Sequence, residues 1–82
     1  MFTKAQFGAR LREQREKAHE TQATMKQLLG VTTTQISDME NGKATTTLEK
    51  FALLCEHYEV SADYLLGLTD DPKPYGRKEE EP

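Results

Sequence analysis

Two short helical segments on either side of Gly30 constrain this chain more than any other feature of its sequence. The first follows Thr21, a residue type that favours a helix N-cap, and carries apolar side chains up to Leu29. The second begins near residue 32 or 33 and ends at Asn41, directly before another glycine. Glycine after the last apolar residue indicates a helix end, because it enters the left-handed region without steric cost. Only residues 30–32 remain as a link, which predicts two helices that cross steeply.

The second segment, residues 33–40, is rich in hydroxyls and contains no basic residue. Its apolar residues are Ile36 and Met39, three positions apart, so one side of this helix is expected to be buried. A helix that crosses its predecessor steeply stands out from the domain, and such a helix fits the major groove of a DNA duplex. Helix capping and a solvated surface would account for the same hydroxyls. From the residues alone, both interpretations stay open.

Three further helices are indicated, and no stretch alternates in the manner of a strand. Thr3 and Gln6 form a capping-box pattern in front of a helix at about residues 4–17. Near the other end, Ser61 is expected to cap a short helix over residues 62–66.

The fourth helix is expected to open with a second capping box, formed by Thr46 and Glu49. Its apolar face would consist of Leu48, Phe51, Ala52, Cys55 and Tyr58. The predicted fold class is therefore all-α, a compact bundle of five helices.

Length and composition limit the domain organisation. With 82 residues the chain has room for one small domain, which we expect over residues 1–69. Residues 70–82 hold three prolines and eight charges but no aliphatic side chain, so they are predicted to form a disordered tail. The longest apolar run, Phe51 to Cys55, is too short to span a membrane. A single cysteine excludes an intrachain disulfide, which suits the reducing cytoplasm.

Two stretches, TQATMKQLLGVTTTQISDMENGK and VSADYLLGLTD, resemble the Cro/C1-type (XRE-like) helix-turn-helix regulators of bacteria and their phages. The resemblance covers residues 3–69, and its motifs are Gln22, LGV at 29–31, IS at 36–37, ENGK at 40–43 and S-x-D-Y-L-L-G at 61–67. It implies a lambda-repressor-like domain with the helix-turn-helix at 21–40. It also implies a sequence-specific DNA-binding transcriptional regulator, a phage- or element-encoded repressor, that acts as a homodimer on double-stranded DNA.

The resemblance assigns roles to individual residues. Gln22 would donate to a phosphate, and side chains of the recognition helix, residues 33–40, would face base edges in the major groove. The residues that follow this helix would hold the DNA backbone, together with the amides at the start of the fourth helix. The DNA-contacting set implied in this way is Gln22, Thr32, Thr33, Thr34, Gln35, Ser37, Asp38, Asn41, Lys43 and Thr46. The resemblance also pairs Arg15 with Glu40 in a structural ion pair.

Charge argues against this reading. The chain carries a net charge of −3 and lacks the basic excess typical of nucleic-acid domains. Cations on plausible faces are Arg10, Arg12, Lys17, Lys26 and Lys43. Asp38 sits within the recognition helix, where a carboxylate repels phosphate but can accept a hydrogen bond from cytosine N4. Whether Asp38 contacts a base or remains a surface charge is open at this point.

A different class of function competes with DNA binding. Lys26 and Leu28 on the second helix depart from the pattern of the family, which favours a small residue at the first position and a polar one at the second. Compensatory repacking of the helices would account for both departures. The alternative is that they form a contact surface for another protein, as in an antitoxin-like or accessory module built on the same scaffold.

An enzymatic function is not expected. His19 and His57 have no metal-ligand spacing, and no nucleophile set or paired-carboxylate pocket is present. Cys55 is interpreted as a small hydrophobic residue. We therefore predict no catalytic residue, no metal and no cofactor.

Overall fold

Five helices follow one another along the chain in the computed structural model, which describes residues 1–74. They are α1 (Lys4–Lys17), α2 (Gln22–Leu29), α3 (Thr33–Glu40), α4 (Leu48–Tyr58) and α5 (Ala62–Leu66). No strand occurs in this described part, and the predicted all-α fold of five helices is confirmed.

A threonine or serine hydroxyl caps the N-terminus of most of these helices. The hydroxyl of Thr3 accepts a hydrogen bond from Gln6 N at 3.1 Å, which is one half of the predicted capping box; within residues 1–74 the Gln6 side chain does not bond back to Thr3 N. Ser61 likewise caps α5 by accepting from Tyr64 N at 3.3 Å. Such caps satisfy backbone N–H groups that have no partner inside the helix. Gly30 closes α2 with a φ of 67°, in the left-handed region that its position requires.

The predicted start of α4 was wrong by one residue. Thr47 is the N-cap, and its hydroxyl accepts from Lys50 N at 3.2 Å, whereas Thr46 and Glu49 form no capping box. Both threonines carry a hydroxyl that can cap, and the capping-box pattern with Glu49 favoured the wrong one. The choice follows from which side of α4 faces the core.

That core-facing side is centred on Leu54, which is fully buried. Phe51 and Tyr58 lie three residues before it and four after it, and both pack against the core. Leu48, predicted to be part of the apolar face, is 80 % exposed. It lies six residues before Leu54, which places it roughly a third of a turn off the stripe. Ala52 is also exposed, because two residues of separation put it on the opposite side of the helix.

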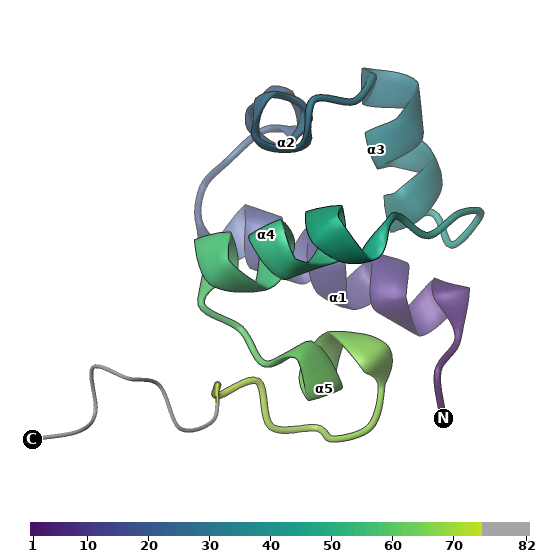
Figure 1. Ribbon diagram of the computed structural model, residues 1–82, viewed down its shortest axis with the longest axis vertical. Helices are drawn as coiled ribbons and strands as arrows, with labels where there is room; N and C mark the ends of the chain where they lie inside the picture. Colours follow the sequence, from purple (N-terminus) through teal and green to yellow (C-terminus); the bar gives the residue numbers. More distant parts are fainter. Residues whose placement is uncertain (75–82) are drawn as a thin grey trace, which may run out of the picture.

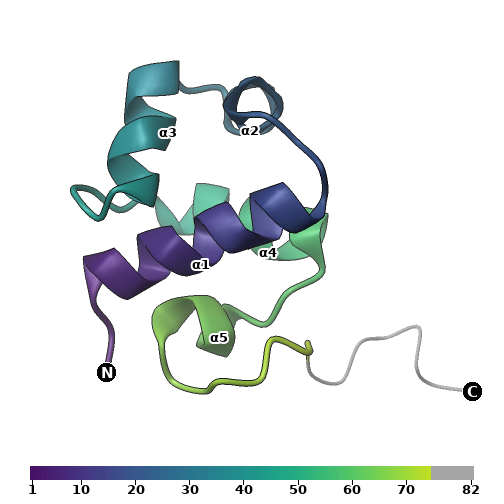
Figure 2. The ribbon, with the colours of Figure 1, turned by 180° about the vertical axis from the view of Figure 1, so that it is seen from behind.

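The helices are arranged in three levels along the longest axis of the molecule (Figures 1 and 2). The pair α2 and α3 lies at one end, α1 and α4 cross the middle, and α5 lies at the other end. α1 packs against both α3 and α5, and α2 packs against α3 and α4. The buried core therefore draws on every helix: Phe7, Leu11, Met25, Leu29, Ile36, Met39, Leu54, Val60 and Leu65.

Gly8 allows α1 to approach the end of α3 closely. It is buried, and a Cβ atom at this position would clash with the backbone carbonyl oxygens of Met39 and Glu40. Because backbone atoms rather than flexible side chains fill this space, a larger residue could enter only if α1 and α3 moved apart. The position of α3 relative to the bundle thus depends on one glycine.

The chain continues along the domain past residue 69, where the sequence predicts a disordered tail. Arg10 forms an ion pair with Asp70 at 2.7 Å, and Ser61 N donates to the carbonyl oxygen of Pro72 at 2.9 Å. Residues 75–82 of the predicted tail lie outside the described residues.

Within residues 1–74, no helix combines the length and the apolar character needed to cross a bilayer. The same residues contain no cluster of His, Cys, Asp or Glu side chains suited to binding a metal ion.

Candidate nucleic-acid interface

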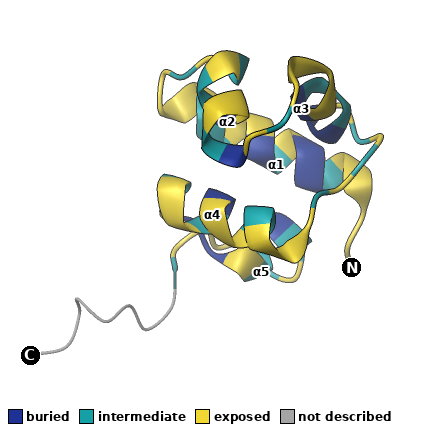
Figure 3. Ribbon diagram, turned by 45° about the horizontal axis from the view of Figure 1, so that its top comes forward, coloured by how far each residue is buried: buried dark blue, intermediate teal, exposed yellow. Residues whose placement is uncertain are grey.

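α3 presents two very different sides. Ile36 and Met39 face the bundle and are 0 % and 2 % exposed, whereas the side chains of the first turn are exposed (Figure 3). The exposed residues are Thr32, Thr33, Thr34 and Gln35, and the next turn adds the half-buried Ser37 and Asp38. The sequence-predicted residues of α3 thus lie together on the side that faces away from the core.

A capping box at the start of α3 engages Gln35. Thr32 Oγ1 accepts from Gln35 N at 3.1 Å, and Gln35 Oε1 accepts from Thr32 N at 2.8 Å. The Thr32 hydroxyl also donates to Gln35 Oε1 at 3.3 Å. The side-chain oxygen of Gln35 is therefore used within the helix, and its NH₂ group remains to donate. This box was not predicted, although Thr32 and Gln35 have the same Thr-x-x-Gln spacing as Thr3 and Gln6.

The inner end of α3 is held by the ion pair between Arg15 and Glu40. Arg15 Nε donates to Glu40 Oε2 at 2.7 Å and Nη2 donates to Oε1 at 3.1 Å, with both side chains largely buried, at 12 % and 3 % exposure. This hydrogen bonding to the carboxylate raises the pKa of the Arg15 guanidinium above its ordinary value. The bidentate geometry fixes α1 to the last residue of α3.

Gln22, the first residue of α2, belongs to the same network. Its Nε2 donates to Glu40 Oε1 at 3.1 Å, and the side chain is half-buried. An amide nitrogen carries two hydrogens, so one of them remains for a further acceptor such as a phosphate oxygen. The contact with Glu40 sets the direction in which this second N–H points.

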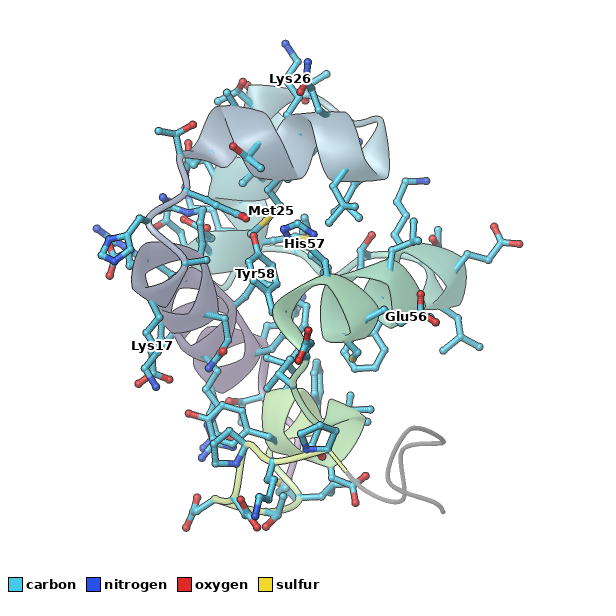
Figure 4. All side chains as sticks on the ribbon, turned by 90° about the vertical axis from the view of Figure 1, so that its left-hand side faces the viewer. Lys17, Met25, Lys26, Glu56, His57 and Tyr58 are labelled. Carbon is cyan, nitrogen blue, oxygen red and sulfur yellow. The ribbon has the colours of Figure 1, made fainter. Side chains whose placement is uncertain are left out.

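The corner between α1 and α2 is stabilised by contacts that the sequence analysis did not find. Both carboxylate oxygens of Glu20 are bonded, one to His57 Nε2 at 2.8 Å and the other to the Tyr58 hydroxyl at 2.9 Å. The two ring side chains reach from α4 toward α2 (Figure 4). Burial raises the pKa of the Tyr58 hydroxyl, and the hydrogen bond to Glu20 raises it further. Glu20 is separated from His57 by 37 positions and from Tyr58 by 38, and no signal in a single sequence links residues so far apart.

Beyond α3, the loop to α4 carries the remaining sequence-predicted residues. Asn41 and Lys43 are exposed, and Asn41 Nδ2 donates to Ser37 Oγ at 3.2 Å. Thr46 is half-buried and precedes the N-cap. Because Thr47 is the cap, the amides without a partner at the start of α4 are those of Leu48 and Glu49, one position later than predicted.

Asp38 has no hydrogen bond or ion pair for its carboxylate within residues 1–74. It lines a small hollow of about 110 Å³ between α3 and the α3–α4 loop, beside Gln35 and Thr45.

The arginines predicted on binding faces are engaged within the domain. Arg10 donates to the carbonyl oxygen of Thr69 at 2.8 Å, pairs with Asp70 and stacks over the Tyr64 ring at 4.0 Å from its centroid. Arg12 pairs with Glu16 at 3.0 Å. Among the five cations named above, Arg12, Lys17, Lys26 and Lys43 are exposed, and the three lysines form no ion pair within residues 1–74.

A family model described as a helix-turn-helix domain matches residues 6–66 of the chain. The chain belongs to this helix-turn-helix family. Its helix-turn-helix consists of α2 and α3, as the resemblance in the sequence implied. An uncharacterized HTH-type transcriptional regulator of Bacillus subtilis (strain 168), YobD, is 43 % identical over 68 residues, which cover 79 % of this chain. The chain spans 58 % of the length of that relative.

Two solved structures share the helix-turn-helix fold. The P22 c2 repressor, in complex with the synthetic operator 9T, is 30 % identical with a TM-score of 0.70; the match covers 77 % of this chain and 96 % of the repressor. The restriction-modification controller protein C.AhdI from Aeromonas hydrophila is 26 % identical with a TM-score of 0.66, covering 76 % and 94 %.

The departures in the helix-turn-helix, Lys26 and Leu28, lie differently in the structure. Lys26 is exposed and points away from the bundle (Figure 4). Leu28 is half-buried and packs against the core. The suggested contact surface on α2 thus offers a charge but little apolar area.

Proposed function

We propose that this helix-turn-helix protein is a sequence-specific DNA-binding transcriptional regulator that acts as a repressor. α3 lies in the major groove, and α2 crosses the phosphate backbone. The observation that carries the proposal is the exposed first turn of α3, where Thr33 and Thr34 have no neighbour to cover them while Ile36 anchors the other side. Threonine hydroxyls bond to base edges, and their methyl groups pack against thymine.

Contacts to the DNA backbone come from both sides of α3. The second N–H of Gln22 donates to a phosphate on one strand. Asn41, Lys43 and the free amides at the start of α4 hold the other side, since a helix N-terminus favours an anion. These contacts fix the register in which α3 enters the groove.

The low positive charge of one copy favours binding as a homodimer. With a net charge of −3, one copy neutralises few phosphates, and two copies on paired half-sites double the footprint. An apolar groove of about 410 Å³ lies beside the α3–α4 loop and includes the exposed Leu48. Burial of this apolar surface against a second copy would favour self-association. The groove is lined by Phe2, Phe7, Thr45, Thr46, Leu48, Phe51 and Leu66.

Selection of random duplexes by the pure protein tests the function. We expect one enriched motif, arranged as an inverted repeat, and an affinity that falls as salt rises. Lys43→Gln should weaken binding to all duplexes alike and reduce the salt slope by about 1. Glu56→Gln on the exposed side of α4 serves as the control and should leave the slope unchanged. A selection that enriches no motif, with binding insensitive to salt, would exclude the regulator.

Protein binding through α2 is the second candidate, but its main apolar residue, Leu28, is packed on the core. Leu28→Lys separates the two functions. If α2 binds a protein, the variant loses that partner while its selected DNA motif stays the same.

A further inference from the structure

The hydroxyls on the outer side of α3 do not by themselves specify a base. Thr33, Thr34 and Ser37 can each donate or accept a hydrogen bond, so they tolerate several bases. Ser37 accepts from Asn41 Nδ2 at 3.2 Å, which leaves its O–H donor and one acceptor lone pair for a further contact. The strongest base discrimination on this side must therefore come from another residue.

Gln35 is prevented from reading adenine. An adenine contact needs both ends of a glutamine amide, because Oε1 accepts from N6 while Nε2 donates to N7. Here Oε1 accepts from Thr32 N at 2.8 Å and from the Thr32 hydroxyl at 3.3 Å. As long as the capping box holds, Gln35 offers only its NH₂ group, which suits a phosphate or a base acceptor.

Asp38 has the opposite chemistry. Ionised, it accepts hydrogen bonds and donates none, and no described residue satisfies it. It lies four residues after Thr34, so both belong to the same side of α3. It also sits near the C-terminal end of α3, where the helix dipole disfavours a carboxylate. A charge in this setting is unfavourable both for the helix and for approach to phosphate.

We propose that Asp38 is the specificity-determining residue of α3 and selects a cytosine. This inference rests on the proposed DNA-binding function and deepens it. In the major groove, only the amino groups of cytosine and adenine donate. Adenine places its N7 acceptor beside the amino group, where it repels the second carboxylate oxygen, whereas cytosine has no such acceptor. The Asp38 carboxylate therefore accepts from cytosine N4.

Asp38→Asn moves two measurable quantities in opposite directions. Loss of the negative charge raises affinity for a nonspecific duplex, because repulsion of the phosphates falls. Preference for cytosine at one position per half-site falls about 10-fold or more, because the contact made by an acceptor-only side chain is lost. The folded state tolerates the change, since Asp38 has no partner to lose; a thermal melt checks this.

The experiment is selection of random duplexes by the full chain, by Asp38→Asn and by the control Glu56→Gln, which removes one exposed carboxylate from α4 instead of α3. We expect a cytosine in the wild-type and control motifs, and its loss from the Asp38→Asn motif alone. A duplex with N4-methylcytosine at that position should bind the wild type more weakly and Asp38→Asn equally well.

The proposal is overturned if Asp38→Asn selects the wild-type motif and binds every duplex more tightly by one common factor. Asp38 would then be a surface charge that meets no base. This result differs from failure of the proposed function, in which the wild type itself selects no motif.

Discussion

The two sides of α3 differ in how completely their polar groups are satisfied. On the inner side, the Glu40 carboxylate receives hydrogen bonds from Arg15 and from Gln22 and is 3 % exposed. On the outer side, the Asp38 carboxylate has no partner among the described residues. Two acidic residues, two positions apart on one short helix, therefore have different physical roles.

The comparison teaches where to expect stability and where to expect binding. A buried polar group without a partner destabilises a protein, so the inner network contributes to the fold. A polar group at the surface without a partner, such as the half-buried Asp38, contributes little to the fold and remains available to a ligand. We therefore expect substitutions on the inner side to change the free energy of unfolding and those on the outer side to change DNA binding.

Glu40→Ala is the largest test of the inner side. It leaves the Arg15 guanidinium in a largely buried position without its carboxylate, and we expect the free energy of unfolding to fall by about 3–5 kcal/mol. Urea denaturation followed by circular dichroism measures this. The control is Glu16→Ala, which breaks the exposed pair with Arg12 and should lower stability by no more than about 0.5 kcal/mol. Equal losses in the two variants would refute the distinction.

Gly8→Ala tests the same side through packing rather than charge. The added methyl group would clash with the backbone oxygens of Met39 and Glu40, so α1 and α3 must separate. We expect a loss of about 1–3 kcal/mol, although alanine favours a helix more than glycine does. Ala9→Ser, at the exposed neighbouring position, should change stability by less than about 0.5 kcal/mol in the same urea titration. A Gly8→Ala variant as stable as wild type would contradict the close approach.

The inner side also shows what sequence alone can and cannot predict. The end of α2 at Gly30 and the start of α5 at Ser61 were predicted because a cap depends on residues within one turn. The start of α4 was predicted wrongly because the capping-box pattern favoured Thr46, which has Glu49 three residues later, whereas the packing of α4 makes the neighbouring Thr47 the cap. The pair of Arg15 with Glu40 came from the resemblance to a family, not from spacing.

Apart from this pair, the contacts between distant segments were not predicted. The bonds of Glu20 with His57 and Tyr58 join residues almost forty positions apart, and Arg10 reaches across to Asp70. Such contacts depend on how the helices pack, which no local pattern encodes. Arg10 was therefore expected to be a cation on a binding face, but its side chain is 13 % exposed and forms an ion pair with Asp70.

The double variant Thr33→Ala with Thr34→Ala tests the outer side. Both side chains are exposed and no core contact is lost, so the free energy of unfolding should stay within about 0.5 kcal/mol of wild type. Binding to the selected duplex should weaken by about 1–3 kcal/mol per lost base contact, as measured by a fluorescence titration. A variant that unfolds readily but binds normally would reverse the roles assigned to the two sides.

Gln35→Ala is expected to have a smaller effect, and it tests both stability and DNA binding. It removes the side chain that accepts from Thr32 N, and we expect stability to fall by about 1 kcal/mol. Gln35→Glu retains an acceptor for the capping box but removes the NH₂ donor. The glutamate variant should therefore keep its stability and lose affinity for DNA. If both variants lose stability equally, the capping box does not explain the role of Gln35.

The smallest expected effect concerns Tyr58, which joins α4 to the corner before α2. Its pKa is raised in the folded state by burial and by Glu20, so the folded protein holds the hydroxyl proton more tightly than the unfolded chain does. Its contribution to stability is complete below the ordinary tyrosine pKa of about 10 and falls as pH rises above it. Tyr58→Phe should flatten this alkaline decline in urea titrations between about pH 9 and 11, whereas binding of DNA at neutral pH should not change. An alkaline decline as steep as that of the wild type would show that other groups, such as Tyr64 with its likewise raised pKa, account for it.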